Sequence, residues 1–214
     1  MRLRVLFSPC GLGLGHVGRC APIARELEKR GAEVLFSTYR DGVPYIEQEG
    51  FPVVDVPPIG FTVKPDGTVD FRQSLINPGP FFTSFTVMRQ VDAEIGVMRA
   101  FKPDVVVSDT RVSPLIAAML LEIPRVSILN QFQIIIPRRS RFLRLAKLVD
   151  AGALAVVGKV WTSGTHVLIP DFPPPYTLSA GNLQIPISYQ RWVKLTGPIL
   201  PVRPEELPSR RKLR

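Results

Sequence analysis

Cysteine and histidine are scarce in this chain of 214 residues, which contains two of each. Cys10 and Cys20 are too few for a disulfide framework, and the sequence has no Cys-x-x-Cys pair that would indicate a zinc site. We therefore expect both thiols to be small buried residues in a reducing compartment.

Long apolar runs are also lacking. No window approaches the roughly 18 consecutive apolar residues of a membrane-spanning helix. The N-terminal stretch MRLRVLFSPCGLG has too short an apolar run, and no small-residue cleavage site, for a signal peptide. We expect a cytoplasmic protein. We find neither internal repeats nor low-complexity tracts, and the length suits one large domain or one domain with a tail.

Acidic residues are outnumbered, with 27 Lys and Arg against 18 Asp and Glu, which gives a formal net charge of +9 and an isoelectric point near 10.1. Such an excess favours an anionic partner, such as a phosphate, a nucleic acid or an anionic membrane surface. A merely solvated basic surface is the alternative, and composition does not separate the two.

Short apolar runs alternate with helical patterns over most of the chain, which is typical of a parallel sheet buried on both faces. We predict a doubly wound, mostly parallel, Rossmann-like α/β sheet of about seven strands, with a strand order that begins 3-2-1-4-5. The domain spans 1–198, and the proline-rich, charged segment 199–214 is expected to be a linker. The expected strands are 2–8, 32–38, 51–56, 104–109, 124–130, 165–170 and 190–199, and the expected helices include 17–30, 43–50, 81–101 and 114–121, the last capped by Ser113.

Three alternate glycines, Gly11, Gly13 and Gly15, follow the first strand. The helix after them starts without Ser, Thr, Asp or Asn, so its free N–H groups and positive dipole end suit an anion such as a diphosphate. A tight turn whose glycines serve only packing is the alternative. The spacing G-x-G-x-G-H is not the dinucleotide fingerprint, although Arg40 after the second strand keeps an NADP-dependent reductase open as a rival.

His16 stands at the exit of this loop, and Asp109 ends the fourth strand. In the expected strand order these two residues meet at the same crevice. A carboxylate on one imidazole nitrogen would fix the tautomer and make the other nitrogen a base for a hydroxyl proton. The alternatives are capping or packing for His16 and local backbone hydrogen bonds for Asp109. His166 lies on an apolar strand, and we assign it no chemistry.

The segment GLGLGHVGRCAPIARELEKRGAEV resembles the first loop and helix of GT-B glycosyltransferases, in the style of MurG-like and archaeal transferases with a G-L-G-H-x-x-R loop. KPDVVVSDT, VSILNQF and LTGPILPVRPEEL are similar to later segments of the same N-terminal, acceptor-binding half. The alternating leucines depart from the paired glycines of MurG loops.

This resemblance implies inverting transfer of a sugar from a nucleotide diphosphate donor, such as a UDP-sugar, to an acceptor hydroxyl, without a metal or other cofactor. His16 would be the base and Asp109 its support. Gly13 and Gly15 would face the donor diphosphate, and Asn130 and Gln131 would contact the acceptor. The second half, which holds most of the donor site, would come from a further domain or a separate subunit. A non-catalytic acceptor-binding or membrane-anchoring subunit, or half of a sugar-nucleotide epimerase, is the alternative.

A basic segment follows the fifth strand, where cations alternate with apolar residues and no acid intervenes. Such a pattern is typical of an interfacial element on an anionic membrane, and it favours a lipid-linked acceptor such as a polyprenyl phosphate sugar. The alternative is a surface helix whose apolar face simply packs on the protein core. We do not expect a nucleic-acid partner, because no recognition motif accompanies the charge. The cations are Arg138, Arg139, Arg141, Arg144 and Lys147.

Overall fold

The computed structural model describes residues 2–58, 79–130, 156–164, 166–183 and 185–201, and these form an α/β fold around one sheet of seven parallel strands. The strand order is β3-β2-β1-β4-β5-β6-β7, which confirms the predicted fold class and the predicted beginning of the order. The strands are β1 (Arg4–Pro9), β2 (Glu33–Thr38), β3 (Val53–Asp55), β4 (Val105–Asp109), β5 (Arg125–Ile128), β6 (His166–Ile169) and β7 (Val193–Leu195).

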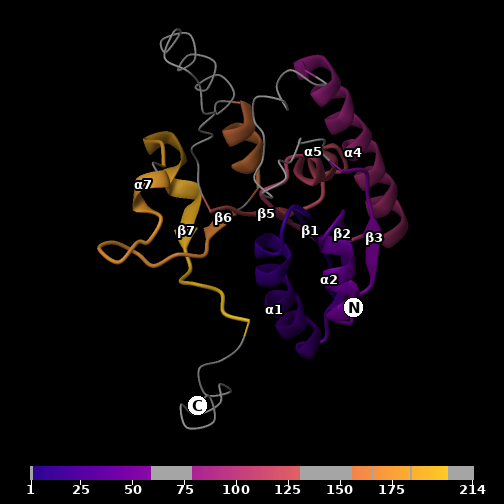
Figure 1. Ribbon diagram of the computed structural model, residues 1–214, viewed down its shortest axis with the longest axis horizontal. Coiled ribbons are helices and arrows are strands. Elements are labelled where there is room, and N and C mark those ends of the chain that lie inside the picture. The colour runs from indigo at the N-terminus through magenta and orange to yellow at the C-terminus, as the bar shows by residue number, and fades with distance from the viewer. Residues whose placement is uncertain (1, 59–78, 131–155, 165, 184, 202–214) are drawn as a thin grey trace, which may run out of the picture.

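Helices cover both faces of this sheet (Figure 1). α1 (Gly15–Lys29) and α2 (Gly42–Gln48) lie on one face, and α4 (Gly79–Phe101) and α5 (Ser113–Leu120) lie on the other. Residues 156–161 are helical and precede β6. The short helix α7 (Ala180–Leu183) and the 3-10 helix η2 (Ile187–Trp192) fill the connection from β6 to β7.

The alternation of side chains along β1 explains why both faces are covered. Val5 and Phe7 pack in the cluster under α1 and α2, whereas Leu6 packs with α4 and α5 on the opposite face. Phe7 also stacks on Phe36 of β2 with ring centroids 5.2 Å apart. Burying each such side chain contributes roughly 1.5–3 kcal/mol, so the central strands form a firm base for the groups at their carboxyl ends.

The carboxyl ends of β1 and β4 lie side by side at the point where the strand order reverses. Pro9 pairs with Asp109, and the Cys10 N–H donates to the Asp109 carbonyl at 3.1 Å. The turns that leave the sheet here contain two non-glycine residues with positive φ, Arg40 after β2 (50°) and Thr110 after β4 (66°). Backbone conformations of this kind are concentrated at active sites and ligand-binding sites.

Some local predictions were wrong. Ser113 does not cap α5, because Val112 occupies the cap position and the Ser113 hydroxyl instead donates to Gln90 Oε1 at 2.7 Å. The last strand is only three residues long, since η2 occupies the preceding residues that we assigned to it.

Three expectations fall on residues outside the described ranges: Gln131, the basic segment 138–147 and most of the linker 199–214. Across the ranges that are described, we find no helix with both the length and the apolar character needed to cross a bilayer.

Candidate active site

The first glycine of the loop is required by close packing. A Cβ on Gly11 would lie 1.8 Å from the Tyr39 carbonyl oxygen, so no other residue fits against the end of β2. Gly13 has φ of +70°, which also favours glycine, whereas a Cβ on Gly15 would meet nothing within 4 Å. Packing therefore explains Gly11, conformation explains Gly13, and neither explains Gly15.

The start of α1 has no side-chain cap, as the sequence predicted. Leu14 occupies the cap position and makes no side-chain hydrogen bond to the helix. The Gly13 N–H, however, donates to Asp41 Oδ2 at 3.3 Å. An anion that uses this N–H must displace an exposed carboxylate, so the loop offers uncapped helix amides with an acid nearby.

His16 and Asp109 meet as predicted. The imidazole Nδ1 lies 2.8 Å from Asp109 Oδ1, and the Thr110 hydroxyl donates to the same oxygen at 2.9 Å. The Asp109 side chain is fully buried, while 22% of the His16 side chain is exposed. The pair thus consists of an inaccessible carboxylate and an imidazole that reaches the crevice.

Arg19, one helical turn after His16, completes the cluster and was not assigned from the sequence. Its Nε and Nη2 donate to the two carboxylate oxygens of Asp109, and Nη1 donates to Asn130 Oδ1 beyond the end of β5. The spacing of three residues, which places His16 and Arg19 on one helix face, was the signal that could have revealed it.

The Asp109 carboxylate is held in its charged form. Burial by itself would raise its pKa, but the hydrogen bonds from His16 and Arg19, together with the Arg19 charge, outweigh burial and lower the pKa below its ordinary value. The neighbouring Cys20 thiol, whose Sγ lies 3.6 Å from Asp109 Oδ2, has its pKa raised well above the usual range, by burial first and by the Asp109 charge second. Cys20 is therefore a neutral donor to the carboxylate and no nucleophile.

The ionised carboxylate decides the tautomer of His16. Nδ1 lies near both Asp109 Oδ1 and, at 3.1 Å, the Arg19 Nη2. It cannot donate to one and accept from the other at once, and an anionic acceptor makes the stronger hydrogen bond. We therefore place the proton on Nδ1 toward Asp109, which leaves Nε2 with a lone pair. The cluster can accept a proton at Nε2 and stabilise the imidazolium that results.

Asn130 links this cluster to a small cavity of about 180 Å³ at the ends of β5 and β6, which Asp171 and Ser179 also line. Asp171 is committed to the adjoining loop, because it accepts from the backbone N–H groups of Phe172, Leu178 and Ser179 and from the Ser179 hydroxyl. These bonds, led by the one from the Ser179 hydroxyl, lower the pKa of Asp171 to about 2. Asp171 therefore has a structural role in the wall of this cavity.

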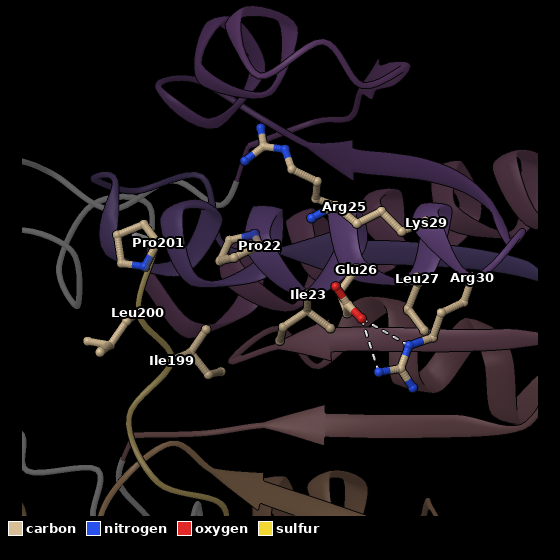
Figure 2. Close-up of a pocket in the computed structure, with 10 residues that line it drawn as sticks. All are labelled: Pro22, Ile23, Arg25, Glu26, Leu27, Lys29, Arg30, Ile199, Leu200 and Pro201. Carbon is tan, nitrogen blue, oxygen red and sulfur yellow. Dashed lines mark hydrogen bonds and ion pairs between the residues drawn. The ribbon is translucent and has the colours of Figure 1, made fainter. Parts of the chain in front are cut away.

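A larger groove of about 670 Å³ lies on the outer face of α1, where the segment Ile199–Pro201 passes over Pro22 and Ile23 (Figure 2). Its most prominent polar pair, Glu26 and Arg30, is an exposed ion pair one turn apart, with 3.0 Å between Arg30 Nη2 and Glu26 Oε1. No residue of the His16 cluster lines this groove, so we place the active site at the crevice despite the difference in size.

His166, to which we assigned no chemistry, is half-buried on β6. Within the part of the chain that the structure describes, no three His, Cys, Asp or Glu side chains are grouped so as to hold a metal ion.

The comparisons with known proteins point to one class. No family model matches the chain. A relative from Methanosarcina mazei, named "Uncharacterized glycosyltransferase", is 29% identical over 215 residues, which cover 96% of this chain and 53% of the relative. The chain has the fold of one half of a GT-B glycosyltransferase. The crystal structures of Acinetobacter baumannii MurG and of LpCGTa in complex with UDP match it with TM-scores of 0.54 and 0.59.

In each of these matches, this chain corresponds to only about half of the other protein. MurG is 18% identical and covers 91% of this chain, which in turn covers 45% of MurG. LpCGTa is 17% identical, with coverages of 94% and 53%. At these identities the solved structures establish the fold alone. The chain spans about half the length of the curated relatives it matches.

Proposed function

We propose that this chain is the acceptor-binding half of an inverting glycosyltransferase, which moves a sugar from a nucleotide diphosphate donor to a hydroxyl group. The observation that carries the proposal is the His16–Asp109 pair at the sheet's switch point, 2.8 Å apart, with the imidazole partly exposed and the carboxylate buried. Ligands of doubly wound sheets bind at this end of the strands. The relatives named as glycosyltransferases support the same class.

The reaction needs one base and one leaving group. His16 Nε2 takes the proton from the acceptor hydroxyl, whose oxygen attacks the anomeric carbon of the donor. The bond from that carbon to the diphosphate oxygen breaks, and the nucleoside diphosphate leaves with the bonding electrons. Asp109 stabilises the imidazolium, in the way that a buried carboxylate supports histidine bases in general. A single displacement inverts the anomeric configuration.

The donor diphosphate would bind at the uncapped start of α1. The N–H groups of the loop at Gly13 and Gly15 and the positive end of the helix dipole would approach the diphosphate, and Asp41 would move aside. LpCGTa, which shares the fold, was solved with UDP, and this supports a UDP-sugar. Most donor contacts would come from a second half, either a further domain or a donor-binding subunit.

For the acceptor, Asn130 lies between the His16 cluster and the small cavity, where its amide would contact acceptor oxygens together with Gln131. A lipid-linked acceptor rests on the basic segment alone. We expect the parent protein to bind liposomes that contain anionic lipid. This binding should be lost when four arginines are changed to Gln: Arg138, Arg139, Arg141 and Arg144. The matched control changes four exposed cations elsewhere, Arg25, Lys29, Arg30 and Arg40. Equal binding by all three proteins, or none by the parent, would contradict a membrane-bound acceptor.

The transfer itself is tested with the chain alone, with the complementary half of the Methanosarcina mazei relative alone, and with the two fused. A panel of nucleotide sugars is offered, and release of nucleoside diphosphate is measured with and without hydroxyl acceptors. We expect acceptor-dependent release by the fusion only. Tight NADPH binding without a response to any nucleotide sugar would contradict the proposal.

A further inference from the structure

Arg19 stands closest to the catalytic pair without belonging to it. Its side chain is 12% exposed, and its guanidinium directs two N–H groups to the two carboxylate oxygens of Asp109. A third N–H donates to Asn130 Oδ1, so the guanidinium is held by both Asp109 and Asn130. This geometry is that of a bidentate pair, the strongest arrangement that arginine makes with a carboxylate.

The charges around the His16 imidazole come from three elements. Asp109 faces it from the end of β4, and Arg19 faces it from α1, with Nη2 3.1 Å from Nδ1. Thr110 contributes a neutral hydroxyl 3.4 Å from Nδ1. Asp41 approaches the loop from the start of α2, where it accepts from Gly13. Cys20, behind Asp109, is neutral.

Among the described residues, Arg19 is the one Lys or Arg side chain that pairs with Asp109, so without it the imidazole would face a buried carboxylate with no such cation bound to it. An unbalanced anion at this distance favours the imidazolium, which has no lone pair for a hydroxyl proton. A general base is useful only in the fraction of molecules that are unprotonated at the working pH. A cation bound to both oxygens of the carboxylate limits this pull while it leaves the Nδ1 hydrogen bond in place.

We propose that Arg19 is a positioning residue that balances the charge of the Asp109 carboxylate, so that His16 keeps its Nδ1 proton, donated to Asp109, and a free lone pair on Nε2. The value of this for catalysis rests on the proposed function, whereas the effect on His16 does not. Three N–H groups of Arg19 are occupied by Asp109 and Asn130, which argues against Arg19 as a free anion ligand.

The test is an NMR titration of the full chain labelled with ¹⁵N-histidine. Long-range ¹H–¹⁵N correlations report both the protonation and the tautomer of each ring. The chain has two histidines, and the His166→Gln variant assigns the signals. Three further variants are compared with the parent. Arg19→Gln removes the charge, and Arg19→Lys keeps the charge but cannot form the two parallel hydrogen bonds. Arg25→Gln removes an exposed arginine of the same helix, α1, which pairs with Glu49.

We expect Arg19→Gln to move the midpoint of the His16 titration upward by about one pH unit, with Nδ1 still protonated in the neutral form. Arg19→Lys should return the midpoint toward that of the parent, and Arg25→Gln should leave it unchanged. A merely structural arginine would lower the melting temperature without moving the midpoint. An unchanged midpoint in a folded Arg19→Gln protein, or an equal shift in Arg25→Gln, would overturn the proposal.

The outcome is independent of sugar transfer. If His16 is not the base, the titration shifts still occur while His16→Ala leaves transfer intact in the fused enzyme. If Arg19 has no effect on His16, the midpoint stays in place whether or not His16→Ala abolishes transfer.

Discussion

Two carboxylate–arginine pairs flank the carboxyl end of β4, and they differ in what surrounds them. Asp109 pairs with Arg19 on the α1 side, beside an imidazole that reaches solvent. Arg111, two residues after Asp109, pairs with Glu94 of α4 at 2.6 Å on the opposite side of the sheet, and these side chains are 1% and 0% exposed. The left-handed turn at Thr110 separates the two pairs.

The partners of the second pair are all fixed protein groups. Arg111 donates to the Ser37 carbonyl at 3.0 Å, and the Ser37 hydroxyl donates to Glu94 Oε2 at 2.8 Å. Arg111 also stacks over the Tyr39 ring, 5.3 Å from its centroid. A pair shielded from solvent and held by a carbonyl, a hydroxyl and an aromatic ring suits a structural role, whereas the pair beside His16 suits chemistry. The same two functional groups therefore occur in a buried structural pair on one side of β4 and in the candidate site on the other.

The largest effect should come from breaking the buried pair. We expect Arg111→Met or Glu94→Gln to lower the free energy of unfolding by about 3–5 kcal/mol, because each leaves a buried charge without its partner. Urea denaturation measures this, and the double variant should recover part of the loss. Arg25→Gln, at an exposed pair, is the control and should cost less than about 1 kcal/mol. A loss in Arg111→Met as small as in the control would remove the distinction between the two pairs.

A smaller loss, of about 2 kcal/mol at neutral pH, is expected for Asp109→Asn, since its Arg19 partner can still reach water. The lowered pKa of Asp109 gives this loss a sign with pH. The contribution of the carboxylate is present above its unfolded pKa of about 3.9 and is lost as pH falls through the lower folded value. Unfolding curves of parent and variant should therefore converge in acid. A constant gap between them would show that packing, not charge, causes the loss.

A third carboxylate, Asp171, is bonded only to neutral donors among the residues that the structure describes. Asp171, bonded to neutral donors and led by Ser179, has its pKa lowered to about 2. Its contribution should be present above about pH 3.9 and disappear as pH falls through about 2. We expect Asp171→Asn to speed amide hydrogen exchange at Leu178 and Ser179 with little effect on global unfolding. Unchanged exchange at both amides would contradict the assigned role.

Much of the fold was predictable because buried parallel strands leave short apolar runs with helical patterns between them. That order also predicted the meeting of His16 with Asp109, two residues far apart in sequence. The Glu94–Arg111 pair was not predicted, because charged side chains are generally expected at the surface. The left-handed turn at Thr110 comes directly before Arg111, whose side chain is buried. Ser113 was misread as a cap because its hydroxyl has a competing tertiary partner, Gln90, that no local pattern indicates.

In our proposal His16 is the base of sugar transfer. The decisive experiment compares kcat for acceptor glycosylation by this chain, fused to a complementary donor half, with and without His16→Ala. We predict a loss of about 10²–10⁴-fold in kcat with donor KM nearly unchanged, because His16 acts on the acceptor proton. A His16→Ala fusion that transfers sugar as fast as the parent would contradict the account.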